Sequence, residues 1–347
     1  MKDIDINELL TLKLPLRFKN GRFRVLMMSD LHGGPGGSPQ LCDAVEAMVA
    51  HTLPDLVVVD GDTSWATDEK SQKEYLATLT EPFEKRGIPW CHIFGNHDHG
   101  YMPDEVSETV FESFPHCVNK RGDPEITGVS NYVLPVMSGD GTKPVFNVWA
   151  LDSGDNMREF RARWGLPEDF RPVMPNYIYE GRDYNSVSFD QQMWYWQASL
   201  ALEKYAGAKV PGIMIMHIPI PEFKIVALNR EACGCRGNQG ESVGCGELNT
   251  GLFATALQRG DIRGIYAGHD HFNDFSGAYC GIELGYDGGM DYDCYVCDEV
   301  RGARVFDIDE NDPANYKTYL VKIRDIMGAK GDNKHLPRQQ ATAAPSQ

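Results

Sequence analysis

Short apolar runs that end at metal-binding side chains recur along this chain. Runs at 23–29, 56–60 and 90–94 stop at Asp30, at Gly61-Asp62 and at Gly95-Asn96-His97-Asp98. Helix-length segments at 39–51 and 69–86 separate these runs. Strands that alternate with helices are typical of an α/β fold, in which helices cross between parallel strands.

The second half of the chain repeats the pattern. A run at 212–216 stops at His217, and a run at 263–267 stops at Gly268-His269-Asp270-His271. One such motif alone is typical of a turn. The carboxyl ends of strands in open α/β sheets form the binding crevice, so motifs far apart in sequence can meet there. Five in this setting favour a shared site over five separate turns.

The candidate ligands have the chemistry of a transition-metal site. Two Asp, one Asn and four His form a mixed oxygen and nitrogen set, which suits Mn, Fe or Zn better than Mg or Ca. Seven ligands are too many for one ion, so we expect two divalent metal ions per chain. The predicted ligands are Asp30, His32, Asp62, Asn96, His217, His269 and His271.

Composition limits the partners and the compartment. The 33 Lys and Arg against 50 Asp and Glu leave a formal charge of −17, which argues against a general grip on nucleic acid or anionic membrane. No signal segment or spanning helix is visible, and an odd number of nine cysteines fits reduced thiols. We expect a cytoplasmic protein, although a secreted protein without its signal would look the same.

The chain has no linker that divides it convincingly. We expect an N-terminal extension at 1–22 and one domain at 23–326. After it, residues 327–347 lose all periodicity and turn to Gly, Lys, Gln, Ala, Pro and Ser. Such a composition predicts a disordered tail.

The five motifs, in the order D-x-H, GD, GNH[DE], H and GHxH, resemble the signature of the calcineurin-like metallophosphoesterase superfamily. The resemblance covers about residues 23 to 310. LDSGDN at 151–156, MHIPIPEF at 216–223 and AGHDHFNDFSG at 267–277 look like the purple acid phosphatase-like branch of plants and fungi. The resemblance implies a four-layer α-β-β-α sandwich with two mixed sheets.

The resemblance also implies a role for each ligand. One ion would be held by Asp30, His32, Asp62 and His271, and the second by Asp62, Asn96, His217 and His269. Asp62 would bridge the two ions. Beside them, His97 would contact phosphate and act as the acid, with Asp98 orienting it.

One position departs from the purple acid phosphatase pattern. The branch carries a tyrosinate ligand three residues after the bridging Asp, where this chain has Trp65. Tryptophan has no oxygen to donate to a metal. We therefore expect a colourless or weakly coloured pair of divalent ions.

The implied function is a dinuclear metal-dependent phosphoesterase that hydrolyses a small phosphomonoester by attack of metal-bound hydroxide. The alternative is a phosphodiesterase acting on cyclic nucleotides or another small diester, because the same core serves both reactions. A non-catalytic scaffold is less favoured, since every ligand is retained. The physiological substrate, the metal and the oligomeric state stay open.

Five cysteines lie in two regions with irregular spacing. A structural zinc site needs matching pairs, which these segments lack, so we expect free thiols. The five are Cys233, Cys235, Cys245, Cys294 and Cys297.

Overall fold

Two β-sheets form the centre of the computed structural model, which describes residues 4–34, 38–168, 183–246, 248–292 and 294–328. The first sheet has five strands in the order β11-β10-β1-β2-β3, and the second has six in the order β4-β5-β6-β7-β9-β8. The strands are β1 (Arg22–Met28), β2 (Leu56–Asp60), β3 (Trp90–Ile93), β4 (Tyr132–Met137), β5 (Pro144–Ala150), β6 (Gly212–Ile215), β7 (Ile262–Ala267), β8 (Ser276–Tyr279), β9 (Ile282–Tyr286), β10 (Gly302–Asp309) and β11 (Lys317–Lys322).

Both sheets are mixed, as expected. In the first, β1, β2 and β3 are parallel, whereas β10 runs antiparallel to β1 and to β11. In the second, β5, β6, β7 and β9 are parallel, and β4 and β8 are antiparallel edges. Parallel strands need crossover connections, which explains the helix-length segments between the apolar runs.

The central strands are apolar on both faces because each sheet is covered on both sides. In β1, Leu26 and Met28 pack toward the helices, whereas Val25 and Met27 pack toward the second sheet. Successive side chains of a strand point to opposite faces. A continuous apolar run is therefore what a strand buried on two faces requires.

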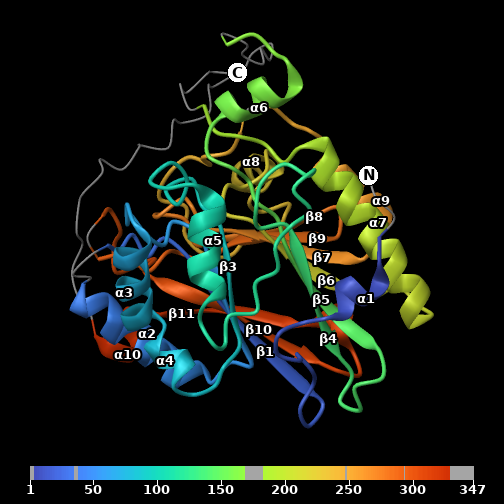
Figure 1. Cartoon of the computed structure of the whole chain (residues 1–347), viewed down its shortest axis with the longest axis horizontal. Helices are drawn as coiled ribbons and strands as arrows, with labels where there is room; N and C mark the ends of the chain where they lie inside the picture. Colours follow the sequence, from blue (N-terminus) through green and yellow to red (C-terminus); the bar gives the residue numbers. More distant parts are fainter. Residues whose placement is uncertain (1–3, 35–37, 169–182, 247, 293, 329–347) are drawn as a thin grey trace.

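Helices cover the outer faces of the sandwich (Figure 1). Helices α2, α3 and α5 pack on the first sheet, and α7, α8 and α9 pack on the second. The expected four-layer α-β-β-α sandwich is confirmed. The helices are α1 (Ile6–Leu10), α2 (Pro39–Thr52), α3 (Glu69–Leu79), α4 (Glu81–Glu84), α5 (Asp104–Glu112), α6 (Met157–Trp164), α7 (Phe189–Ala206), α8 (Glu222–Leu228), α9 (Leu252–Arg259) and α10 (Ile323–Met327), with a 3₁₀ turn at Pro313–Asn315.

The described part of the N-terminal segment packs against the domain. Leu16 and Phe18 are buried in the core between the sheets, and α1 lies against α7 and β4. Of the tail predicted at 327–347, Met327 is the last residue of α10, and the residues from 329 onward lie outside the described residues. Among the described helices, none has the length and apolar character to cross a bilayer.

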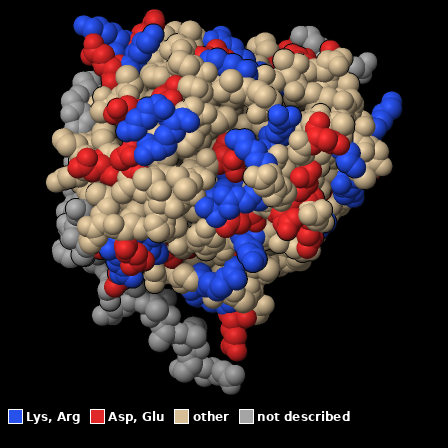
Figure 2. Space-filling model, turned by 90° about the horizontal axis from the view of Figure 1, so that it is seen from below, with Lys and Arg blue, Asp and Glu red and all other residues tan. Residues whose placement is uncertain are grey.

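Basic and acidic side chains are interspersed on the face seen from below (Figure 2). Some basic and acidic side chains of the protein pair directly, as Arg24 does with Asp307 at 2.6 Å. Interspersed charges of both signs produce a weaker field than a patch of one sign.

Candidate metal centre

The predicted ligands follow strands of both sheets. Asp30, Asp62 and Asn96 come after β1, β2 and β3, whereas His217 and His269 come after β6 and β7. All five strands present their carboxyl ends to one edge of the sandwich, where the topology places a binding crevice.

The structure brings together the four residues predicted for the first ion. One ligand atom from each of Asp30, His32, Asp62 and His271 lies within 4.8 Å of the other three. The Nε2 atoms of His32 and His271 are 3.0 Å apart, and His271 Nε2 is 3.1 Å from Asp30 Oδ1. All four side chains are buried.

A second group shares Asp62 with the first. Its ligand atoms come from Asp62, His217 and His269, again within 4.8 Å of one another. Asp62 Oδ2 lies 3.2 Å from His217 Nε2 and 3.7 Å from His32 Nε2. One carboxylate oxygen thus faces a histidine of each group, which is the position that a bridging ligand needs.

Asn96 was predicted as the remaining ligand of the second ion. Its Oδ1 is buried and has no hydrogen-bond partner among the described residues. It stands between Gly95, whose backbone touches Asp62, and His97, whose amide donates to Asp62 Oδ1 at 2.7 Å.

Two other polar atoms test whether this site suits metal ions. Asp30 Oδ1 and His217 Nε2 are buried without a hydrogen-bond partner among the described residues, despite their close neighbours. Buried polar atoms are rarely left unpaired, because each costs about 1–3 kcal/mol. Lone pairs that converge without hydrogen-bonding geometry fit a shared cation, so the residues suit the implied ions.

The free ring nitrogens of two ligands are fixed by backbone carbonyls. His217 Nδ1 donates to Asp60 O at 2.7 Å, and His271 Nδ1 donates to Tyr295 O at 2.9 Å. A donor bond from Nδ1 sets the tautomer that leaves the Nε2 lone pair for a metal.

Four predicted ligands have a left-handed backbone. The φ angles are 53° at Asp30, 40° at His32, 49° at Asp62 and 73° at His269. For residues other than glycine this conformation costs about 1–2 kcal/mol each. Strain of this kind clusters at functional sites, where the surrounding structure imposes it.

Glycines in two motifs allow the loops to touch. A Cβ on Gly95 would stand 2.3 Å from Asp62 N and 2.9 Å from His217 Cδ2. A Cβ on Gly61 would stand 2.6 Å from Gly95 Cα, and Gly61 also has a φ of 79°. The Gly before Asp62 and the Gly before Asn96 are therefore required by close packing of two strand ends.

Burial and neighbouring charges shift the pKa values of the titratable groups in the site. Burial opposes ionisation of Asp62, but His217 and His32 outweigh it and hold the pKa of Asp62 well below its usual range. Burial lowers the pKa of His32 to about 4 and that of His269 to about 3. These two histidines are therefore neutral near pH 7, which is the form that binds metal.

The structure places His97 and Asp98 differently from each other. His97 is exposed, and its ring centroid is 5.4 Å from that of His32, at the edge of the ligand cluster. Asp98 is buried. Its carboxylate accepts from the amides of Thr63 at 2.9 Å, Ser64 at 3.0 Å and Gly95 at 2.9 Å.

The orienting role predicted for Asp98 stays a prediction, and its contacts in the structure lie elsewhere. Its second oxygen is 3.3 Å from His92 Nε2, a buried ring behind the site. The contacts that the structure gives the Asp98 carboxylate are these amides and His92, and the ring of His97 is not among them. Asp98 holds the loops after β2 and β3 together, and orientation of His97 is not its observed contact.

Several neighbours of the site were not anticipated from sequence. Ser29 links Asp30 to Asp287 through its hydroxyl. Tyr184 meets His269 edge to face, with ring centroids 4.4 Å apart. His99 had no assigned role, and neither Ser29, Asp287 nor Tyr184 lies in a recognisable motif.

His99 is buried between two carboxylates. Its Nδ1 is 2.9 Å from Asp104 Oδ2, and its Nε2 is 3.4 Å from Asp152 Oδ1. Burial opposes protonation, but the two carboxylates raise the pKa of His99 well above its usual value. The charged contacts of His99 with Asp104 and Asp152 therefore hold the end of the loop that carries Asn96 in place.

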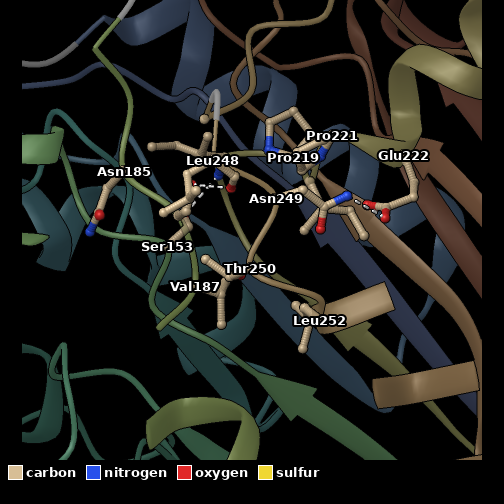
Figure 3. Close-up of a pocket in the computed structure, with 14 residues that line it drawn as sticks. Ser153, Asn185, Val187, Pro219, Pro221, Glu222, Leu248, Asn249, Thr250 and Leu252 are labelled. Atoms are coloured by element: carbon tan, nitrogen blue, oxygen red, sulfur yellow. Dashed lines mark hydrogen bonds between the residues drawn. The ribbon is translucent and has the colours of Figure 1, made fainter. Parts of the chain in front are cut away.

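Two cavities flank the loops of the site. One, of about 10 Å³, lies beside the segment that follows His217 and is lined by Ser153, Asn185 and Asn249, among others (Figure 3). It has room for about one water molecule. In this view Asn249 points to Glu222, to which its amide donates at 2.8 Å.

The other cavity measures about 510 Å³ and is lined by His99, Glu108, Arg121, Asp152 and Asn185, among others. His99 follows His97 by two residues, and Asn185 follows Tyr184, which contacts His269. Its lining therefore continues the loops that carry the predicted ligands, and its size admits a small organic group.

Known proteins are similar to this chain in sequence and in fold. The family model described as calcineurin-like phosphoesterase matches residues 23–273. Two Arabidopsis thaliana proteins are similar over most of their length. "Probable inactive purple acid phosphatase 29" is 30% identical, covering 92% of this chain and 85% of the relative. "Probable inactive purple acid phosphatase 14" is 29% identical, covering 81% and 73%.

A solved structure supports the fold. A dimetal phosphatase from Danio rerio superimposes with a TM-score of 0.50 at 13% identity, covering 87% of this chain and 99% of that one. The resemblance to the purple acid phosphatase-like branch is also confirmed by the two plant relatives. The family implies a dinuclear metal centre, and the two ligand groups that share Asp62 lie where such a centre belongs. This chain is a member of the calcineurin-like phosphoesterase family.

Proposed function

We propose that this protein hydrolyses a small phosphomonoester with two divalent metal ions. The observation that carries the proposal is the pair of ligand groups that share Asp62 and are buried. A scaffold that had lost its chemistry would have no reason to keep four strained ligand conformations at this edge.

The ions, when bound, would lower the pKa of a water and neutralise the phosphate oxygens. His32 and His271 with Asp30 would hold one ion, and His217 and His269 with Asn96 would hold the other. Asp62 Oδ1 accepts a hydrogen bond from the backbone amide of His97, which leaves Oδ2 to face the ligand groups of both ions. The protein thereby fixes the separation of the two sites.

His97 is placed to meet the substrate. It is exposed at the edge of the cluster, while its backbone is anchored by Asp62. A protonated imidazole there can donate to the leaving oxygen. The 510 Å³ cavity that begins at His99 offers room for the organic part of the substrate.

Two other readings are separable by experiment. A phosphodiesterase would place its second ester substituent in the same cavity. A protein that binds a phosphate ester without hydrolysing it is the other alternative, because the two plant relatives carry the word inactive in their names. Those names concern the relatives, and this chain retains every predicted ligand.

The test combines metal analysis with two chromogenic substrates. Purified protein is loaded with Mn, Zn or Fe and assayed on p-nitrophenyl phosphate and bis-p-nitrophenyl phosphate. We expect two ions per chain, preference for the monoester, and loss of both turnover and one or more ions in Asp62→Asn. The matched control is Asp325→Asn, an exposed carboxylate on α10.

Each other outcome has a defined meaning. Preference for the bis-ester would replace the monoesterase proposal with the diesterase. Two bound ions with no turnover on either substrate or on a phosphosugar and nucleotide panel would favour the binding protein. Fewer than one ion per chain at saturation would refute the dinuclear centre.

A further inference from the structure

The chain after β9 folds back across the first ligand group. Met290 N donates to Ser29 O at 3.1 Å, which joins this segment to the residue before Asp30. Farther along, one ligand atom each from Asp291 and Cys294 lies within 4.8 Å of those of His32 and His271. Two histidines of the predicted centre therefore belong to a second possible ligand set, with a carboxylate and a thiol.

Two contacts hold this segment against His271, and a third holds its Asp291. The ring of Tyr295 stacks on the imidazole, with centroids 4.2 Å apart and planes 8° from parallel. Tyr295 O also accepts from His271 Nδ1 at 2.9 Å. Arg301 Nε donates to Asp291 O at 2.9 Å from a fully buried position. The approach of Asp291 and Cys294 is thus supported from both sides.

Asp291 and Cys294 are also fixed relative to each other. The amide of Cys294 donates to Asp291 Oδ2 at 2.6 Å. Such a turn places a carboxylate and the following thiol on one side of the chain. Cys297, three residues later, does not belong to the ligand group found among the described residues.

The separation suits coordination of one ion. Nitrogen and sulfur ligands bond Zn²⁺ at about 2.0–2.3 Å, so two ligands of one ion stand at most roughly 4.6 Å apart. The four ligand atoms lie within 4.8 Å of one another, so coordination of one ion needs only a small adjustment. Trp65 packs beside His32, at 5.3 Å between ring centroids, and supplies no ligand atom.

We propose that Cys294 and Asp291 supply additional ligands to the ion held by His32 and His271. This proposal rests on the dinuclear centre of the proposed function. The thiol would lose its proton to solvent as the sulfur binds the metal. A thiolate is a soft ligand, so the first site would favour Zn, Co or Fe(II) over Mn.

Cobalt substitution tests the sulfur directly. We expect Co(II) protein to show the near-ultraviolet thiolate-to-cobalt charge-transfer absorption, and Cys294→Ala to lose it. Cys297→Ser is the matched control, because it removes a thiol in the same segment, and it should keep the band. Identical spectra for wild type and Cys294→Ala, or no band in wild type, would overturn the proposal.

Metal affinity and thiol protection provide independent readouts. Cys294→Ala and Asp291→Asn should each weaken Zn binding at least about tenfold, measured by chelator competition. In wild-type protein, Zn should protect Cys294 from iodoacetamide, with exposed Cys280 as the internal control in peptide mapping. Equal modification of Cys294 with and without Zn would refute ligation without any variant.

Turnover measured on the same samples separates the two proposals. A cobalt–thiolate band in a protein that hydrolyses no phosphate ester supports the ligand assignment and refutes the proposed function. A protein that hydrolyses phosphate esters, lacks the band and has Cys294 modified equally with and without Zn would support the proposed function and refute the ligand assignment. Circular dichroism of Cys294→Ala should match wild type, because the side chain is only half-buried.

Discussion

Glu108 is a buried carboxyl whose ionisation should weaken the fold as pH rises. It lies on α5, with 1% of its surface exposed, and lines the larger cavity. Asn119 Nδ2 donates to its Oε1 at 3.1 Å, and its Oε2 has no hydrogen-bond partner among the described residues. Burial raises the pKa of Glu108 to about 8.

The magnitude follows from linkage. The native state holds this proton up to about pH 8, whereas the unfolded chain releases it near pH 4.5. The contribution of Glu108 to stability is therefore greatest below pH 4.5, falls as pH rises between these values and levels off above pH 8. At roughly 1.4 kcal/mol for each tenfold change in proton affinity, the full span is about 5 kcal/mol. Relaxation around the charge reduces it, so we expect about 2–5 kcal/mol.

Glu108→Gln isolates this effect, since glutamine copies the shape of the neutral acid. Urea unfolding at pH 5, 6, 7, 8 and 9 should show the variant gaining stability relative to wild type by about 2–5 kcal/mol across the series. Glu105→Gln, an exposed position one turn earlier on α5, should show no such trend. The reasoning would be refuted if the difference in the free energy of unfolding between wild type and Glu108→Gln stayed constant within about 0.5 kcal/mol across the pH series.

Three further changes probe the site. Gly95→Ala should lower the metal content, because its Cβ would stand 2.3 Å from Asp62 N; plasma emission analysis checks it, and Gly34→Ala, with open space around its Cβ, should keep both ions. His97→Asn should slow alkyl phosphate hydrolysis by about 10²–10⁴ and p-nitrophenyl phosphate hydrolysis far less, because only a poor leaving group needs the proton; equal losses on both would contradict the acid role. Asp98→Asn should cost about 1–3 kcal/mol in urea unfolding, since one oxygen facing backbone amides becomes a donor; unchanged stability would count against its structural role.

The ligand positions were predictable because the chemistry is local. Asp30, His32, Asp62, His217 and His269 each follow an apolar strand closely, and the carboxyl ends of such strands meet at one edge. Periodicity identified the strands, and residue type identified the ligands. The structure confirmed the two mixed sheets and placed the predicted residues together.

The sequence did not indicate the direction in which each side chain of a turn points. Asp98 is adjacent to His97 in sequence, yet its carboxylate faces Thr63, Gly95 and the ring of His92. A turn can send neighbouring side chains to opposite sides, and no periodic pattern records which side each takes.

By itself, the sequence determined the strands that precede the predicted ligands, the helix-length segments between the first of these strands, and the chemistry of the main ligand set. Each depends on residue type at short spacing. Only the tertiary structure decided that Cys294 and Asp291 approach His32 and His271, and that His99 lies between Asp104 and Asp152. These contacts join residues brought together by turns and by packing between the sheets, and local spacing carries no information about how far apart such residues end in space.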